Sequence, residues 1–439
     1  MEQTDERTIS LTLMAGAEFL PVVLSFVEKT AEVLGLAKNE CLQLTLAAEE
    51  IFSYLARSVC PGAVVSIQCV NGIYFAKVNF QFPVAAFHLG GLNITSTVTP
   101  ENEPNLDEMG LVIAARFVDK LAITKKKQNE ITLTIIKEKA YPEGITDTMK
   151  RPLATENTVI ERPDGETVKL FAMMVDAYSG DSLIPAFFKY PGKVADMVFS
   201  GDYRMLTAMN QRREICGGIL FHHRNEKIIE SYGPFVFSEE RALETGTALW
   251  EACLNLLART KTIGVVSVYG LPEWLQKDSE DLGYFEFSGE TTTSVKMPVF
   301  YRLLHEDPGG VVWTDKRLVE YLRNEYDRLF LARDIRIVAN MGEHHHDASI
   351  FSTEFRKDCA QAILRPLWPG RDADKNVRNH IQTLLEEKVS NIFFEIDSGI
   401  PWHAELIPAL IGNGFIPSMI IPFAGESDLI IFRYHAPRS

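Results

Sequence analysis

Residues 391–435 read NIFFEIDSGIPWHAELIPALIGNGFIPSMIIPFAGESDLIIFRYH. The stretch opens with residues 392–396, an apolar run rich in β-prone side chains that predicts a buried strand. Residues 405–411 have helical composition, and Gly414 ends this helix because glycine readily adopts the left-handed conformation found at helix ends. Two further strand-like runs lie within residues 418–434. The stretch therefore predicts a strand–helix–strand–strand unit.

A weaker copy of this pattern occupies residues 264–303. Its first strand, residues 265–269, is followed by the turn Gly270-Leu271-Pro272-Glu273-Trp274 and a short helix. Leu282-Gly283-Tyr284-Phe285 then leads into further strands, as Gly414-Phe415 does in the later copy. The shared order and spacing predict a duplicated α/β unit.

Composition places the chain among ordinary globular proteins. The 439 residues are 46% hydrophobic and 23% charged, which predicts two or three domains and no membrane span. The net charge of -15 repels phosphate backbones, so we expect no nucleic-acid partner. Six scattered cysteines without a CxxC pair, and an N-terminus unlike a secretion signal, predict a cytoplasmic protein with reduced thiols.

The N-terminal third has a recognisable order of elements. An edge strand at residues 8–14 precedes two amphipathic helices and a strand pair joined by Asn71-Gly72, a hairpin-type turn. A polar loop, residues 93–107, separates this pair from a third helix at residues 109–121. A last strand, residues 131–136, completes the region.

Three short motifs accompany this order. They are Glu50-Ile51-Phe52-Ser53-Tyr54, Asn79-Phe80-Gln81, and Glu108-Met109-Gly110-Leu111 followed by Asp119. They stand where the anti-sigma-factor serine kinases, a branch of the GHKL (histidine-kinase-like) ATPase superfamily, carry Glu-x-x-x-Asn, Asp-x-Gly and Gly-x-Gly-Leu with a later Asp. Residues 8–138 resemble that family, with departures in each motif.

The resemblance implies an α/β sandwich that binds ATP with magnesium, in which Glu50 is the general base. Its nucleotide contacts would be Asn79, Gly110 and Asp119. Tyr54 replaces the family's magnesium-holding Asn, and Glu108 puts bulk and negative charge where the triphosphate must approach. These departures predict a fold that is kept as a protein-binding module. A solvated helix edge is the alternative interpretation of Glu49 and Glu50.

The remaining chain begins with a predicted linker at residues 139–167, interrupted by proline and glycine. The pattern then predicts these elements in order: a strand at 168–175, a helix–loop region at 182–198, strands at 216–222 and 228–236, a helix at 239–260 and the first repeat. This order resembles the GNAT N-acetyltransferases. The resemblance implies tandem GNAT-like mixed-sheet domains at residues 168–304 and 311–439, after an N-terminal domain at residues 1–138. The predicted fold class is α/β (α+β).

GNAT enzymes hold the pyrophosphate of acetyl-CoA on a glycine-containing loop at a helix start, where backbone N–H groups stabilise the anion. The first copy has Ser238-Glu239-Glu240-Arg241 at this point, which reads as an ordinary helix start capped by Ser238. The second copy has Gly370 and Arg371 before a helix. The resemblance makes them the candidate CoA site, and a rigid loop is the alternative.

Three other stretches carry ligand-type side chains. Glu395 and His403 flank the strand-to-helix turn of residues 391–435, where a carboxylate and a histidine suit acid–base work. Trp402 matches Trp274 of the first copy, which favours a packing role instead. Consecutive histidines point in different directions, so Glu343-His344-His345-His346-Asp347 predicts an exposed loop, with zinc binding as the alternative. His222-His223 lies at a hairpin end and is expected on the surface.

Three functional hypotheses follow. The first is a cytoplasmic regulatory protein whose N-terminal domain binds a protein partner and whose GNAT-like domains bind a small molecule or a partner. The second is an acyl-CoA-dependent N-acetyltransferase regulated by that domain. The third is an ATP-binding serine/threonine kinase of the anti-sigma type.

Overall fold

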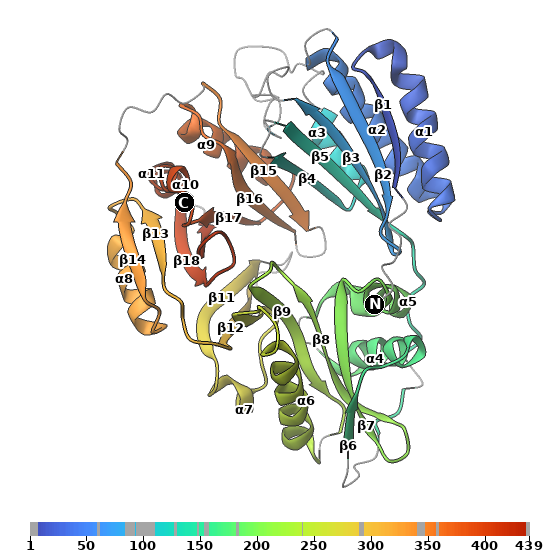
Figure 1. Cartoon of the computed structure of the whole chain (residues 1–439), viewed down its shortest axis with the longest axis vertical. Coiled ribbons are helices and arrows are strands. Elements are labelled where there is room, and N and C mark those ends of the chain that lie inside the picture. The colour runs from blue at the N-terminus through green and yellow to red at the C-terminus, as the bar shows by residue number, and fades with distance from the viewer. Residues whose placement is uncertain are drawn as a thin grey trace.

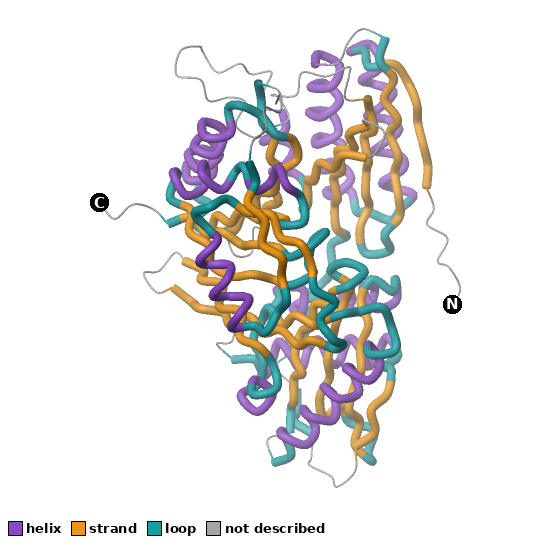
Figure 2. The backbone as a smooth tube through the Cα atoms, turned by 60° about the vertical axis from the view of Figure 1, so that its left-hand side comes forward, coloured by secondary structure: helices purple, strands orange, loops and turns teal. Residues whose placement is uncertain are grey.

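The structure is a computed structural model, and it describes residues 8–58, 62–83, 93, 110–126, 130–146, 149–152, 158–180, 184–238, 240–288, 294–339, 347–356 and 360–435. These residues form a mixed α/β fold whose sheets have five, seven, two and five strands (Figure 1). Figure 2 shows the strands of the larger sheets converging toward the middle of the molecule, with most helices on its outside.

The N-terminal sheet is antiparallel, in the order β1-β2-β3-β5-β4, and helices cover one of its faces. Alternation sets the two faces, because Val78 and Phe80 of β3 are buried against the helices while Asn79 between them points to the opposite face. The elements are β1 (Thr8–Met14), η1 (Ala17–Phe19), α1 (Leu20–Val33), α2 (Lys38–Ser58), β2 (Val64–Asn71), β3 (Phe75–Pro83), α3 (Gly110–Phe117), β4 (Lys120–Lys126) and β5 (Glu130–Glu138).

Strand β4 was not expected from the sequence. The third helix was predicted to run to Leu121, but α3 ends at Phe117 and Lys120 already pairs with Ile136 of β5. Leu121 and Ile123 are buried two residues apart, which is the spacing of a strand. Residues 120–126 are too few for sequence alone to distinguish the two-residue period of a strand from the helical period of the preceding residues.

The seven-stranded sheet has the order β11-β12-β10-β9-β8-β7-β6, and its only parallel pair within the described residues is β9–β10. Helices α4 and α5 lie against one face, and α6 lies against the other. Its elements are β6 (Thr158–Glu161), α4 (Gly165–Tyr178), η5 (Ala186–Lys189), α5 (Pro191–Phe199), β7 (Tyr203–Asn210), β8 (Ile215–His223), β9 (Ile228–Val236), α6 (Ala242–Leu257), β10 (Gly264–Ser267), α7 (Glu273–Gln276), β11 (Glu280–Ser288) and β12 (Ser294–Leu303).

Two expectations for this region were wrong. Residues 168–175, predicted as a strand, belong to helix α4, which Asp164 caps by accepting a hydrogen bond from the Thr167 N–H at 2.8 Å. Its buried positions Val168, Phe171 and Val175 have helical spacing, which the apolar run disguised. The predicted linker of residues 139–167 contains β6, which pairs with β7, and the start of α4.

The third part contains a five-stranded sheet, β15-β16-β17-β19-β18, and a separate parallel pair, β13–β14. Residues 391–435 fold as predicted, into a strand, short helices and two antiparallel strands. The elements are β13 (Gly310–Thr314), α8 (Val319–Arg328), β14 (Arg333–Ile337), β15 (Ile350–Arg356), β16 (Gln361–Trp368), α9 (Ala373–Glu386), β17 (Asn391–Asp397), α10 (Pro401–Ala404), α11 (Ile407–Gly412), β18 (Phe415–Ile421) and β19 (Leu429–Tyr434).

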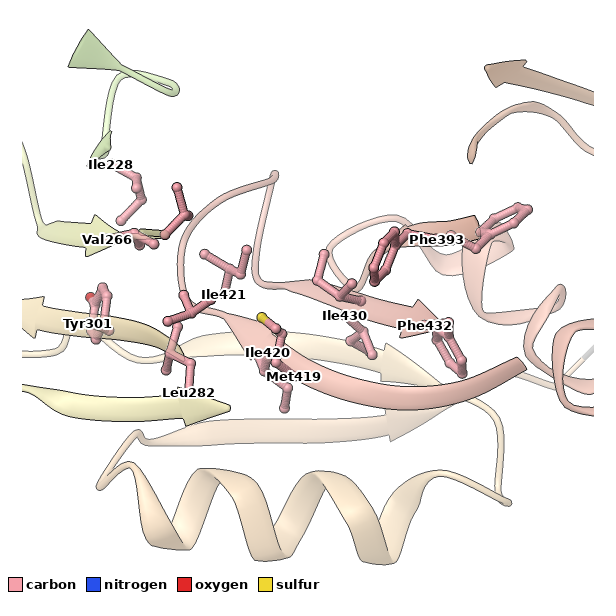
Figure 3. Close-up of a cluster of buried hydrophobic side chains, with 14 of the residues drawn as sticks. Ile228, Val266, Leu282, Tyr301, Phe393, Met419, Ile420, Ile421, Ile430 and Phe432 are labelled. Carbon is pink, nitrogen blue, oxygen red and sulfur yellow. The ribbon is translucent and has the colours of Figure 1, made fainter. Parts of the chain in front are cut away.

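The two repeats share one hydrophobic core. Figure 3 shows Leu282 of β11 close to Met419 and Ile420 of β18, which lie in the other sheet. Gly283 has φ +117° at a bulge inside β11, and an added Cβ would lie 3.2 Å from the Ser418 carbonyl oxygen. Gly283 therefore permits close contact between the sheets, whereas the sequence suggested a helix-to-strand step at this position.

A parallel strand pair marks the same place in both repeats. β9 pairs with β10 as far as Ser231 and Ser267, whose hydroxyl oxygens are 2.7 Å apart, and β9 then continues to Val236 paired with β8 only. β16 pairs with β17 as far as Leu364 and Phe394. Beyond these residues both strands continue, but they no longer pair with each other. Tyr232, Arg365 and Glu395, which directly follow these pairings, line cavities between the sheets.

Candidate ligand site at the junction of three sheets

Two adjoining cavities lie where the three large sheets meet. The first, called the aromatic cavity, has a volume of about 670 Å³ and is lined from Tyr74 of the N-terminal sheet to Phe355 of β15. The second, called the ionic cavity, has a volume of about 540 Å³ and contains Arg365 and Glu395. The two share these lining residues: Lys120, His222, Glu230 and Glu354.

An alternating chain of charges runs through the junction. Lys120 Nζ lies 3.9 Å from Glu354, and Glu354 accepts a hydrogen bond from Arg365 Nη1 at 2.7 Å. Arg365 Nε donates to Glu395 at 2.6 Å, and Arg224 Nη2 donates to the other oxygen of Glu395 at 3.2 Å. Arg224 Nη1 also lies 3.4 Å from Glu230, so charged groups from all three sheets are joined.

Glu395 is the centre of this chain. Only 6% of the residue is exposed. Burial opposes its ionisation, but Arg365 and Arg224 outweigh that effect and hold the pKa of Glu395 below its ordinary value. With both carboxylate oxygens bonded to arginines, Glu395 is a fixed anion in this structure and a poor proton acceptor.

His403 lines the ionic cavity together with Glu395, so the structure brings these two candidates to one site. Its Nδ1 faces the Asp397 N–H at 3.3 Å and therefore accepts a hydrogen bond, which places the ring hydrogen on Nε2. Burial lowers the pKa of His403 to about 4. The side chain is a neutral donor at pH 7.

The two matched tryptophans both pack against their surroundings. The Trp402 ring centroid lies 4.3 Å from that of His403, and Trp402 packs against the core shared by the repeats. Trp274 packs on Gly246 of α6, where an added Cβ would lie 3.3 Å from the indole.

A cluster that the sequence did not suggest lies beside the end of the β9–β10 pairing. The Tyr232 hydroxyl donates to Glu230 Oε1 at 2.8 Å and lies 3.3 Å from His222 Nε2. The His222 and Tyr232 rings are stacked, with an interplanar angle of 12°. Burial and then the charge of Glu230 raise the pKa of Tyr232, so its hydroxyl stays protonated.

His222 corrects the expectation that this hairpin end is simply surface. Its side chain lines both cavities and is 22% exposed. A signal for the cluster was present in the two-residue spacing of Glu230 and Tyr232, which places both on one face of β9. The pairing of Tyr203 with His222, which brings a third ring from β7, could not be known from sequence.

The four residues of the nucleotide resemblance are spread over the N-terminal unit. Glu50 is half-buried on α2, and burial followed by the charge of Glu49 raises its pKa. Asn79 accepts a hydrogen bond from the Thr134 hydroxyl at 2.8 Å on the sheet face away from the helices. Glu50 and Asn79 line neither cavity of the junction.

Gly110 and Asp119 lie near opposite ends of one short helix. Gly110 opens α3, and Asp119 follows its C-terminus. The Asp119 carboxylate accepts hydrogen bonds from Lys137 Nζ at 3.1 Å and from the Glu138 N–H at 2.7 Å. Asp119 lines the aromatic cavity, whereas Gly110 does not.

Gly370 and Arg371 immediately precede Asp372 and helix α9. Gly370 packs directly on a neighbouring segment, where an added Cβ would lie 2.0 Å from the Ser349 nitrogen. The Ser349 N–H donates to Asp372 at 2.5 Å, which places a carboxylate at the start of the helix. The Arg371 side chain is 64% exposed and lies 3.9 Å from Asp347. The backbone contacts assign Gly370 a packing role, as in the rigid-loop alternative.

The start of helix α6 also differs from expectation. The helix begins at Ala242 with Arg241 in the capping position, and no side chain caps it. Ser238 is therefore not its N-cap. Arg241 forms an ion pair with Glu244 in the first turn.

Two further features concern metals and membranes. Within the described ranges, no group of three or more His, Cys, Asp or Glu side chains converges as metal ligands would, and His344, His345 and His346 lie outside those ranges. Of the helices that the structure describes, none has both the length and the apolar composition needed to cross a bilayer.

Comparison with known proteins gives partial structural similarity only. No protein-family model and no curated protein matches the chain. The chain is similar to a GNAT-superfamily phosphinothricin acetyltransferase of Sinorhizobium meliloti solved with AcCoA, at 15% identity and TM-score 0.29, covering 34% of this chain and 89% of that one. It is also similar to the aminoglycoside 6'-N-acetyltransferase of Enterococcus faecium, at 13% identity and TM-score 0.27, covering 34% and 99% of the two chains.

Proposed function

We propose that the chain is a cytoplasmic regulatory protein that binds a small molecule at the junction of its three sheets. The observation that carries this proposal is the shared lining of the two cavities, to which every large sheet contributes. Binding pockets of several hundred Å³ at unit boundaries are the usual place for a small ligand.

The charge chain supplies a physical route from ligand to regulation. A ligand that binds one residue of the charge chain, such as Glu230, changes the ion pair between Glu230 and Arg224. Because Arg224 also pairs with Glu395, that pair changes as well. Since these groups belong to different sheets, binding changes how the sheets are held together. In this proposal the N-terminal unit passes that change to a protein partner.

Acyl transfer is the second candidate, and one observation favours it. Glu230, Tyr232 and His222 form a hydrogen-bonded set next to the point where β9 and β10 stop pairing. A protonated tyrosine between a carboxylate and an imidazole can deliver a proton to a leaving group while the carboxylate accepts one. Pro234 counts against acyl transfer, because it lacks an N–H and this part of β9 therefore offers one backbone donor fewer to an acyl oxygen.

The test combines thermal unfolding with hydrogen exchange on the full chain. A panel of organic cations, organic anions, acetyl-CoA, and ATP with magnesium is screened for an increase in Tm. For the active compound, we expect slower exchange in β4, β9 and β15 together. Protection restricted to one sheet contradicts the proposal.

A separate assay distinguishes the two candidates. Acetyl-CoA is incubated with the protein and the active compound, and free CoA thiol is measured over time. Turnover that is lost in Tyr232→Phe establishes acyl transfer in place of ligand sensing. Binding without turnover is the result expected for a regulatory protein.

A further inference from the structure

The aromatic cavity has a wall of contiguous rings. The Tyr232 ring lies 5.6 Å from Phe187, 6.3 Å from Tyr203 and 5.6 Å from Tyr269, measured between centroids. Tyr74 and Phe75 of the N-terminal unit and Phe355 of β15 line the other sides. Rings arranged around a space of about 670 Å³ suit a compact ligand that contacts π-faces.

The charged groups that line this cavity are mostly carboxylates. They are Asp119, Glu138, Asp202, Glu230 and Glu354, against the two cations Lys120 and Lys193. The cations that pair with several of these acids stand outside the lining, since neither Lys137, Arg224 nor Arg365 reaches this cavity. Within the lining, Lys193 pairs with Glu138 and Lys120 lies 3.9 Å from Glu354, so five carboxylates against two lysines leave the cavity with an excess of negative charge.

Combining the rings with the acids, we infer that the aromatic cavity binds an organic cation, including one with a quaternary nitrogen. The inference rests on the proposed function, because it names the ligand class of that site. Rings attract a cation through their negative faces, and the carboxylates add charge complementarity without requiring an N–H on the ligand. An organic anion would face five carboxylates against two lysines, and this excess of negative charge disfavours its binding.

The test uses three probes of nearly equal shape: choline, its uncharged analogue 3,3-dimethylbutan-1-ol, and the anion 3,3-dimethylbutanoate. Isothermal titration of the full chain at pH 7 is expected to show choline binding at least ~10-fold more tightly than the alcohol, and no binding of the anion. Equal affinity for choline and the alcohol overturns the inference, as does the absence of choline binding at 10 mM.

Two variants locate the site. Asp202→Asn removes a carboxylate at the exposed edge of the lining and is expected to weaken choline several-fold, whereas Glu226→Asn, at an exposed position outside the lining, is the matched control. Ala186→Trp fills the cavity and is expected to abolish binding. Choline affinity that survives Ala186→Trp overturns the assignment to this cavity. Folding of each variant is checked by its Tm.

The outcomes separate this inference from the proposed function. If the protein prefers the alcohol or the anion, and Ala186→Trp abolishes that binding, the cation inference is wrong but the ligand site at this cavity stands. Failure of all three probes removes the cation inference, while the wider panel with hydrogen exchange continues to test the proposed function. A panel compound that protects only one sheet removes the proposed function itself.

Discussion

Arg333 shows how one buried side chain holds a small element in place. It belongs to β14, its side chain is 1% exposed, and it donates to Asp428 at 2.7 Å and to Asp307 at 2.9 Å. Its guanidinium also lies over the Phe423 and Tyr326 rings, at 4.6 and 5.6 Å from their centroids. The β13–β14 pair is thereby fixed to the loop before β19.

We expect Arg333→Met to lower the free energy of unfolding by about 3–5 kcal/mol, because it leaves the fully buried Asp428 without its cation. Urea unfolding at pH 7 measures this loss. Arg336→Met is the matched control on the same strand, since Arg336 is half-exposed and pairs with an exposed Asp334. A similar midpoint for both variants would show that the buried pair is not important for stability.

Two buried histidines predict how stability depends on pH. Burial lowers the pKa of both His380 and His403 to about 4, below the ordinary value of 6.5. The unfolded chain therefore binds more protons between these values, and stability is lost as the pH falls from 6.5 toward 4. We expect each histidine to cost about 2 kcal/mol between pH 7 and pH 5.

Urea midpoints measured at pH 7 and pH 5 test this sign and size. His380→Met removes one titrating group and should reduce the pH dependence by about half. An unchanged dependence in that variant would assign the acid sensitivity to other groups.

At the scale of elements, the Asn93 side chain ties the start of β15 to the N-terminal unit, in addition to the Lys120–Glu354 pair and the apolar contacts of Ile350. Asn93 Nδ2 donates to the Ser349 carbonyl at 2.8 Å, and its Oδ1 accepts from the Phe351 N–H at 3.0 Å. Asn376 of α9 donates to the same carbonyl at 2.9 Å. The Ser349 oxygen thus has two donors, whereas the Phe351 N–H depends on Asn93.

We expect Asn93→Ala to destabilise the protein by about 1–3 kcal/mol, because the buried Phe351 N–H loses its acceptor. Hydrogen exchange should show the fastest change at Phe351, within β15, rather than in β16. Asn413→Ala, at a half-exposed helix end, provides a comparison in which little change is expected. Uniform acceleration across the whole sheet would argue against a local tie.

At the scale of the whole molecule, Glu395 is joined to the seven-stranded sheet through Arg224, while Arg365 of its own sheet links it through Glu354 to Lys120 of the N-terminal sheet. We expect Glu395→Gln to cost about 3–5 kcal/mol, since Arg224 and Arg365 are left close together without the charge between them. Lys120→Gln, at the 46% exposed end of the same chain of charges, should cost less than about 1 kcal/mol.

Thermal unfolding followed by both fluorescence and circular dichroism tests this prediction. In Glu395→Gln, the two signals should separate if the sheets then unfold independently. Coincident transitions at an unchanged Tm would show that the shared hydrophobic core, rather than the charge chain, joins them.

Local sequence patterns determined much of the architecture. Alternation and turn residues predicted β2, β3, β8 and β9, and the repeat in residues 391–435 was found with its strands in the right order, because these signals act over a few neighbouring residues. The same reasoning failed for α4, whose nearly continuous apolar run fits a strand as well as a helix, and for the short strand β4.

Only the tertiary structure decided which side chains meet. The sequence proposed Glu395 and His403, and they do line one cavity, but it could not show that Arg224 and Arg365 would hold Glu395 as a fixed anion. Nor could it show that Tyr74, Tyr232 and Phe355, which come from three different parts of the chain, would line one cavity. Periodicity records which face a residue occupies, whereas the partners across an interface depend on how whole sheets pack.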